Sequence, residues 1–115
     1  QVLVFSLGSV GDDSVLMRSG NVLRSEMTSL VEAGAVGDLL GHFINRRGEI
    51  VDPELDARTI GLSLSNLRSR DRVIGVAVGA AKQKVTLGAL KAGLINVLIT
   101  DEATASYALE HAHER

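Results

Sequence analysis

The chain lacks cysteine, and this absence excludes disulfide bonds and thiolate metal sites. A cysteine-free sequence suits a reducing compartment, so we expect a cytoplasmic protein. The chain also lacks any apolar run near the roughly 20 residues that a helix needs to cross a bilayer. We therefore expect no membrane partner.

An excess of basic residues is also missing, because 12 Lys and Arg stand against 14 Asp and Glu and give a formal net charge of −2. A chain of this charge without a basic cluster is a poor candidate for binding a phosphate backbone by itself. Any DNA-binding part is expected to lie elsewhere. Only one proline and no low-complexity stretch occur, so no linker is predicted and residues 1–115 are expected to form one domain or a piece of one.

Three short apolar runs, at residues 2–7, 73–78 and 95–99, predict strands that are buried on both faces of a sheet. Apolar residues at helical spacing predict helices near 21–33 and 81–92, each followed by a glycine, and a last helix capped by Thr100 and Asp101. Residues 36–44 fit either a helix or a strand. Residues 45–51 predict a hairpin, and residues 59–64 a further strand.

The alternation of strand and helix predicts a doubly wound, mainly parallel α/β sheet. In such sheets ligands bind beyond the carboxyl ends of the strands. Small and polar residues collect at three of these ends, at residues 8–11, 79–82 and 100–102. The three ends are therefore the candidate binding site.

Three segments in series resemble the SorC family of bacterial transcription regulators. Residues 34–38, with Gly41 and Gly48, are similar to its GAVGDILG…G segment; residues 78–82 resemble its GGxxK turn; and residues 94–102 resemble its glinvLiTDExtA strand and cap. The resemblance covers essentially all 115 residues and corresponds to the C-terminal half of the effector domain. It leaves the N-terminal half and the helix-turn-helix outside this chain.

This resemblance implies a fold like that of ribose-5-phosphate isomerase, glucosamine-6-phosphate deaminase and CoA-transferase, with sensing in place of turnover. It also implies a sugar or sugar phosphate as effector, a homo-oligomer, DNA binding through the absent helix-turn-helix, and neither a cofactor nor a metal. Two family glycines are replaced here, by Ser6 and Val78. Both replacements add bulk near the expected pocket.

Lys82 and Asp38 are the strongest candidate ligand residues. Lys82 follows a glycine turn and opens a helix, where backbone amides and an ammonium together suit an anion. The alternative for Lys82 is a solvated surface lysine. Asp38 lies in an apolar segment, where its carboxylate suits sugar hydroxyls; the alternative is an ordinary turn carboxylate. The remaining candidates at the strand ends are Gly8, Ser9, Gly79, Thr100 and Asp101.

No paired acid and base, nucleophile elbow or metal-chelating histidine pair stands out, and the three histidines are expected to be surface or core residues. The sequence therefore favours a non-enzymatic sensor that shifts its oligomeric arrangement when a sugar phosphate binds. The alternative is a sugar-phosphate isomerase or deaminase on the same fold, since a shared fold does not decide function. A third possibility is that the chain mainly supplies an oligomerisation surface.

Overall fold

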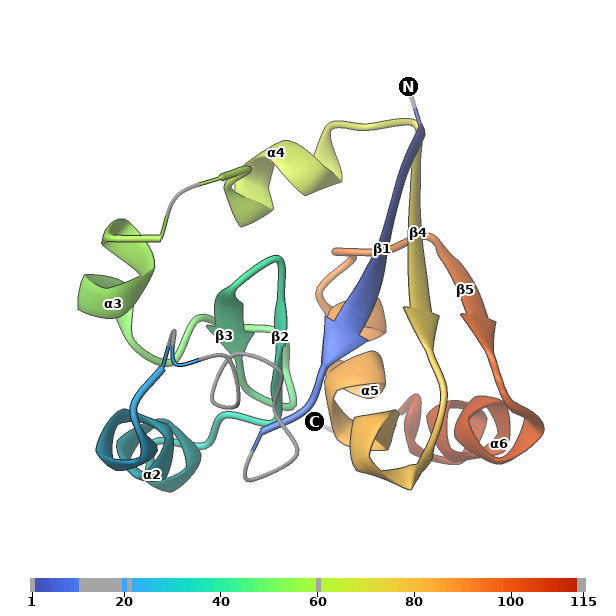
Figure 1. The fold of residues 1–115 in the computed structure, drawn as a ribbon. Helices are drawn as coiled ribbons and strands as arrows, with labels where there is room; N and C mark the ends of the chain where they lie inside the picture. Colours follow the sequence, from blue (N-terminus) through green and yellow to red (C-terminus); the bar gives the residue numbers. More distant parts are fainter. Residues whose placement is uncertain (1, 11–19, 21, 60, 114–115) are drawn as a thin grey trace.

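The computed structural model describes residues 2–10, 20, 22–59 and 61–113. Its centre is a five-stranded sheet with the order β3-β2-β1-β4-β5 (Figure 1). β1, β4 and β5 run parallel, whereas β2 and β3 are antiparallel to their neighbours. The strands are β1 (Val2–Gly8), β2 (Gly37–Leu39), β3 (His42–Ile44), β4 (Arg72–Ala77) and β5 (Val97–Thr100). The predicted α/β fold with a mainly parallel sheet is confirmed.

Helices join and cover these strands. Within the described residues, none of them is long and apolar enough to cross a membrane. They are α2 (Arg24–Glu32), α3 (Pro53–Ala57), α4 (Leu64–Arg68), the 3₁₀ turn η1 (Ala80–Lys82), α5 (Gln83–Lys91) and α6 (Glu102–His111). The predicted helices near 81–92 and after Thr100 are confirmed. The predicted helix near 21–33 is α2, although its expected first residue, Asn21, lies outside the described residues.

The crossover helix α5 forms the main core with the inner face of the sheet. Val85 and Ala89 of α5 pack with Phe5 and Leu7 of β1 in one buried cluster. Close approach is possible because Gly88 has no side chain: a Cβ there would lie 2.6 Å from the carbonyl oxygen of Asn45. α6 packs beside α5, on the same side of the sheet.

The predicted burial of the strands on both faces is wrong for this chain. Val2 and Val4 of β1 are exposed, and so are Val97 and Ile99 of β5. Side chains alternate between the faces of a strand, so these residues all project away from α5. The described residues therefore bury only one face of these strands, although the runs are apolar on both faces.

Residues 36–44, which fit either a helix or a strand, form the β2–β3 hairpin. The hairpin predicted at residues 45–51 is confirmed, because the turn at 45–48 leads into a bridge between Ile44 and Ile50. The predicted strand at 59–64 is wrong. Its described residues form a loop that ends at Ser63, whose hydroxyl accepts a hydrogen bond from the amide of Asn66 and begins α4.

Candidate functional site

The buried carboxylate of Asp38 stands directly over the backbone of Gly8. Asp38 lies on β2 opposite Gly8 of β1, and its side chain is 9% exposed. A Cβ on Gly8 would lie only 2.0 Å from Oδ1 of Asp38, so any larger residue would displace the carboxylate. On its other side, Oδ2 of Asp38 accepts a hydrogen bond of 3.1 Å from the amide of Gly41. Gly8 therefore leaves the space that the carboxylate occupies, and the amide of Gly41 holds it there.

Burial raises the pKa of the Asp38 carboxyl above its ordinary value of 3.8. The amide of Gly41 and the positive charges of Lys82 and His42 act in the opposite direction and lower it. Desolvation disfavours the ionised form, and nearby positive charge favours it. Among the described residues, Asp38 accepts one hydrogen bond, from Gly41, and such a partly desolvated carboxylate is suited to accept further hydrogen bonds from ligand hydroxyls.

Lys82 reaches this region from the turn between β4 and α5. Gly79 begins the turn with a φ of 106°, a conformation that favours glycine, and its carbonyl oxygen accepts a hydrogen bond of 3.1 Å from the Lys82 amide. The Lys82 carbonyl then accepts a 2.7 Å hydrogen bond from the hydroxyl of Thr86, which steadies the first turn of α5. The ammonium of Lys82 is close enough to act on the charge of Asp38.

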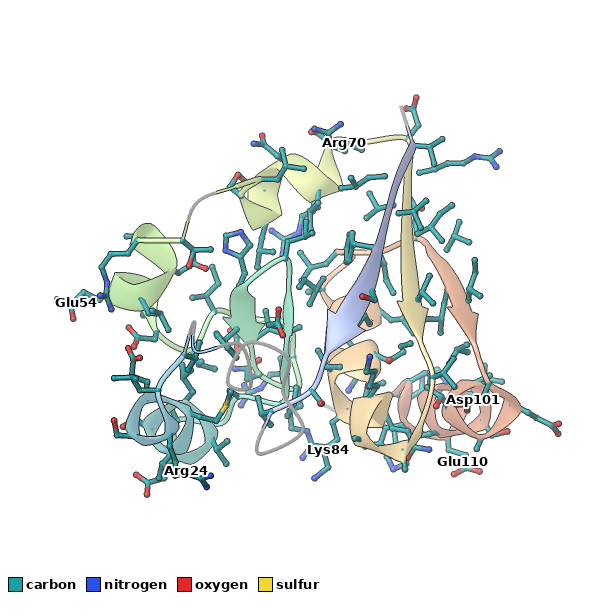
Figure 2. All side chains as sticks on the ribbon, viewed as in Figure 1. Arg24, Glu54, Arg70, Lys84, Asp101 and Glu110 are labelled. Atoms are coloured by element: carbon teal, nitrogen blue, oxygen red, sulfur yellow. The ribbon has the colours of Figure 1, made fainter. Side chains whose placement is uncertain are left out.

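Asp101 lies beside the start of α6 (Figure 2), and both it and Thr100 make structural contacts at the carboxyl ends of β4 and β5. Oδ1 of Asp101 accepts from the amide of Thr104, and Oδ2 accepts from the amide of Gly79, both at 2.7 Å. These two bonds lower the pKa of the Asp101 carboxyl, with the Gly79 amide as the larger cause. The hydroxyl of Thr100 donates to the carbonyl oxygen of Ala77 at 2.5 Å. Both side chains thus hold the ends of β4 and β5 together.

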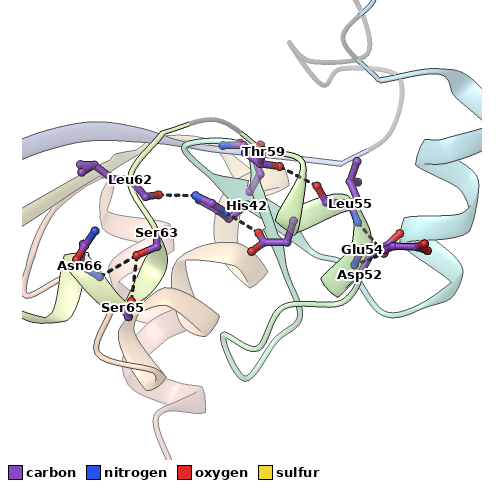
Figure 3. A network of polar contacts seen from close by, with 12 residues as sticks. His42, Asp52, Glu54, Leu55, Thr59, Leu62, Ser63, Ser65 and Asn66 are labelled. Atoms are coloured by element: carbon purple, nitrogen blue, oxygen red, sulfur yellow. Dashed lines mark hydrogen bonds and ion pairs between the residues drawn. The ribbon is translucent and has the colours of Figure 1, made fainter.

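His42 connects the Asp38 hairpin to the segment that carries α3 (Figure 3). Its ring is 3% exposed, so of the two alternatives expected for the histidines, surface or core, His42 is a core residue. Nδ1 lies 2.5 Å from Oδ1 of Asp56, and Nε2 lies 2.5 Å from the carbonyl oxygen of Leu62. Both partners are hydrogen-bond acceptors, so the ring ties β3 to residues that lie 14 and 20 positions further along the chain.

The structure brings the predicted residues together in two adjoining groups. Gly8 and Asp38 meet at the end of β1, and the charge of Lys82 acts on this pair. Gly79 and Asp101 are hydrogen-bonded to each other at the ends of β4 and β5. Ser9, the residue that follows β1, is buried. Val78, which replaces a family glycine and follows β4, is exposed.

Sequence reasoning missed two groups that act on Asp38, the amide of Gly41, which donates a hydrogen bond to it, and the ring of His42, whose charge lowers its pKa. The signal that would have found them is Leu40-Gly41, a tight turn that brings residue 42 back beside residue 39. Both residues of this turn have a positive φ, 54° at Leu40 and 88° at Gly41. Among the described residues, no group of three His, Asp or Glu side chains is placed to hold a metal ion.

Comparison with known proteins places this geometry in a family. Residues 1–110 match the family described as "Putative sugar-binding domain". The chain is 39% identical over 105 residues to the transcriptional regulator LsrR of Enterobacter sp. (strain 638), a match covering 89% of this chain and 32% of that protein. It is 38% identical over 104 residues to the deoxyribonucleoside regulator of Bacillus subtilis (strain 168), covering 90% of this chain and 33% of that protein.

Solved structures agree. A transcriptional regulator from Streptococcus pneumoniae TIGR4 superposes with a TM-score of 0.87 at 27% identity, over 98% of this chain and 43% of that one. The full-length sorbitol operon regulator SorC of Klebsiella pneumoniae superposes with a TM-score of 0.81 at 28% identity, over 95% of this chain and 35% of that one. The chain spans about a third of the length of the curated relatives described above. It belongs to the family of sugar-binding domains found in transcriptional regulators of the SorC type.

Proposed function

We propose that residues 1–115 are the C-terminal part of the effector domain of a bacterial transcription regulator, and that this domain binds a phosphorylated sugar without turning it over. The observation that carries the proposal is the buried carboxylate of Asp38, which lies over Gly8 and within the electrostatic reach of Lys82. An acidic acceptor beside a cation matches the two chemistries of a sugar phosphate, hydroxyl donors and an anion.

In this proposal Asp38 accepts hydrogen bonds from sugar hydroxyls, while Lys82 and the backbone amides at the start of η1 and α5 receive the phosphate. Gly8, Ser9 and Gly79 form the floor of the site at the strand ends. Thr100 and Asp101 act mainly by fixing the Gly79 turn, because their polar atoms already have backbone partners.

The signal passes to DNA through the oligomer. A ligand changes an equilibrium between two arrangements only if it binds them with unequal affinity. We propose that the sugar phosphate favours one arrangement of a cytoplasmic homo-oligomer, and that DNA-reading domains outside residues 1–115 respond to it. The naming of the curated relatives as transcriptional regulators supports this role.

Thermal unfolding of the intact regulator with a panel of sugar phosphates tests the proposal. A ligand at a hundred times its dissociation constant stabilises the folded state by about 2.7 kcal/mol. Lys82→Ala is expected to remove most of this stabilisation and to leave the unliganded melting temperature nearly unchanged. Lys84→Ala is the matched control, because Lys84 lies two residues further along, in the first turn of α5, and is exposed.

Equal ligand binding by the Lys82→Ala variant and the native protein would show that the phosphate lies elsewhere. The enzymatic alternative has its own test in the same preparation. Isomerisation of ribose 5-phosphate or deamination of glucosamine 6-phosphate by the intact protein would show that it is an enzyme and would contradict the proposed sensor. We expect neither reaction above the uncatalysed rate.

A further inference from the structure

The ring of His42 has an acceptor at each of its two nitrogens. Nδ1 lies 2.5 Å from Oδ1 of Asp56, and Nε2 lies 2.5 Å from the carbonyl oxygen of Leu62. A carbonyl oxygen can only accept, so Nε2 carries a hydrogen. The Asp56 side chain is 22% exposed, so water stabilises its ionised form, and an ionised carboxylate also only accepts. A ring that donates from both nitrogens is an imidazolium, so the contacts of His42 indicate a positive charge.

This charge is enclosed by the protein beside the effector site. His42 is 3% exposed, and a buried charge is unfavourable unless it is paired and hydrogen-bonded. Both ring N–H groups have partners here, and the Asp56 carboxylate balances the charge. His42 lies on β3 opposite Leu39, the residue that follows Asp38 on β2. The ring thus brings a second cation, besides Lys82, close enough to act on the Asp38 carboxylate.

The backbone at His42 also controls the hydrogen bond that Asp38 accepts. Leu40 and Gly41 form the turn between β2 and β3, and both have a positive φ. The Gly41 amide donates to Oδ2 of Asp38 at 3.1 Å. Because Gly41 directly precedes His42, an anchored His42 ring limits the movement of this amide. The anchor therefore acts on Asp38 through the turn as well as through charge.

The segment that receives the ring is itself braced by hydrogen bonds (Figure 3). Oδ1 of Asp52 accepts from the amides of Glu54 and Leu55, each at 3.1 Å, and begins α3. The hydroxyl of Thr59 donates to the carbonyl oxygen of Leu55 at 3.1 Å. Thr59 also packs close to the turn, since a Cβ on Gly41 would lie 3.2 Å from its Cγ2. α3 and its flanking residues therefore give the hairpin a rigid support.

We propose that His42 is a positioning residue of the effector site. As an imidazolium anchored at both ring nitrogens, it fixes the turn whose amide binds Asp38, and it keeps the Asp38 carboxylate ionised for the ligand. A phosphate that pairs with Lys82 neutralises the other cation near Asp38, whereas the enclosed charge of His42 remains. This inference rests on the place of Asp38 in the proposed function, and His42 itself needs no contact with the ligand.

Nitrogen NMR of the ring tests the charge without a ligand. The intact regulator is prepared with isotope-labelled histidine, and the His42 signals are identified by their loss in His42→Gln. If this variant does not fold, contacts with Leu62 identify them instead. We expect both ring nitrogens to carry a directly bonded hydrogen at neutral pH. A ring with one unprotonated nitrogen would overturn the proposal.

Carbon NMR of the Asp38 carboxyl tests whether the charge acts on it. His42→Gln keeps an amide donor but removes the charge. Ser63→Ala is the matched control, because it removes the hydroxyl that begins α4, next to Leu62, and leaves the ring intact. We expect the pKa of Asp38 to rise in His42→Gln and to keep its native value in Ser63→Ala. The native pKa in His42→Gln would show that the histidine is only structural.

Ligand affinity separates this inference from the proposed function on which it rests. The probe is the sugar phosphate of the panel that most stabilises the native protein. We expect its affinity to fall on the order of tenfold in His42→Gln and to stay unchanged in Ser63→Ala. A raised Asp38 pKa with native affinity would remove Asp38 from the effector site and leave the role of His42 intact. Lowered affinity with a native Asp38 pKa would refute the role of His42 alone.

Discussion

Asp38 and Asp101 lie at the same edge of the sheet, yet their carboxylates are held in opposite ways. Asp38 is buried, accepts a backbone hydrogen bond from Gly41, and has a pKa raised by desolvation. Asp101 binds two backbone amides, one through each oxygen, and these bonds lower its pKa. Among the described residues, Asp38 accepts a single hydrogen bond and can accept others from a ligand, whereas each oxygen of Asp101 already accepts one from the backbone.

This contrast separates a binding residue from a structural one by its hydrogen-bond partners. A carboxylate that satisfies the free amides at a helix start stabilises the protein whether or not a ligand is present. A buried carboxylate with few partners is unfavourable for the folded state until a ligand supplies donors. Changes at the two aspartates should therefore move stability and affinity in different proportions.

Gly8→Ala is expected to have the largest effect, because it acts on the floor beneath Asp38. The new Cβ would lie 2.0 Å from Oδ1 and 2.9 Å from Cγ of Asp38, so the carboxylate must rotate away from its place. Overpacking of this kind costs about 1–3 kcal/mol of unfolding free energy. We also expect effector binding to be lost, as measured by calorimetry. Lys84→Ala, at an exposed position of α5, is the control and should change neither quantity. A Gly8→Ala variant with native affinity would exclude Asp38 from the site.

Asp38→Asn should weaken effector binding while leaving the unliganded protein as stable as before or more so. A hydrogen bond to a charged group contributes about 1.5–3 kcal/mol, so affinity should fall on the order of tenfold to a hundredfold. Stability should not fall, because the raised pKa shows that burial disfavours the ionised form, and the penalty for that form is present once the pH exceeds the raised pKa. Calorimetry and thermal unfolding at neutral pH measure the two effects. A destabilised variant with native affinity would give Asp38 the structural role instead.

Asp101→Ala should show the reverse pattern, a melting temperature lower by several degrees and a smaller change in affinity. The amides of Gly79 and Thr104 lose their acceptor, and Asp101→Asn should recover part of the loss because its one carbonyl oxygen can still accept. The lowered pKa sets the pH dependence: the stabilisation is complete above the ordinary value of 3.8 and is lost as the pH falls through the folded pKa. The native protein should therefore lose more stability than Asp101→Asn on acidification. If the native protein and Asp101→Asn lost the same stability on acidification, the hydrogen bonds from the amides of Gly79 and Thr104 to Asp101 would not be the cause.

Patterns in the sequence predicted the elements that depend on local chemistry. The stripe that became α5, the Asp101 cap of α6 and the left-handed glycine after α2, Gly34 with a φ of 101°, were all confirmed. Each of these depends on spacing or on a single residue's conformational preference, which the sequence shows directly. The same reasoning placed Lys82 in the turn after the strand that became β4, where the structure has it. Asp38 was singled out for its apolar segment and for the family resemblance, and the structure places it within β2.

What failed depends on contacts between distant residues. Residues 59–64 have a strand-like composition, but the Ser63 cap and the Leu62 carbonyl bound to His42 place the described part of them in a loop. The exposure of Val4 was missed because an apolar run does not show which of its two faces is covered by helices of the same chain. The different roles of Asp38 and Asp101 were also hidden, since neither the burial of a carboxylate nor the identity of its donors is a local property.

Leu40→Asn should have the smallest effect and should stabilise the hairpin that carries Asp38. Leu40 has a φ of 54°, and a branched side chain in this left-handed region is strained by roughly 1 kcal/mol, whereas asparagine tolerates it. Leu40 is 37% exposed, so its replacement also gives up part of its apolar burial, and this loss offsets much of the backbone relief. We expect unfolding free energy to rise by at most about 0.5 kcal/mol in denaturant titrations. The comparison variant is Val31→Asn, which removes a similarly exposed aliphatic side chain from the right-handed helix α2 and should not stabilise the protein. A loss of stability in Leu40→Asn would mean that the Leu40 side chain makes a contact in the intact regulator that outweighs the relief of its backbone.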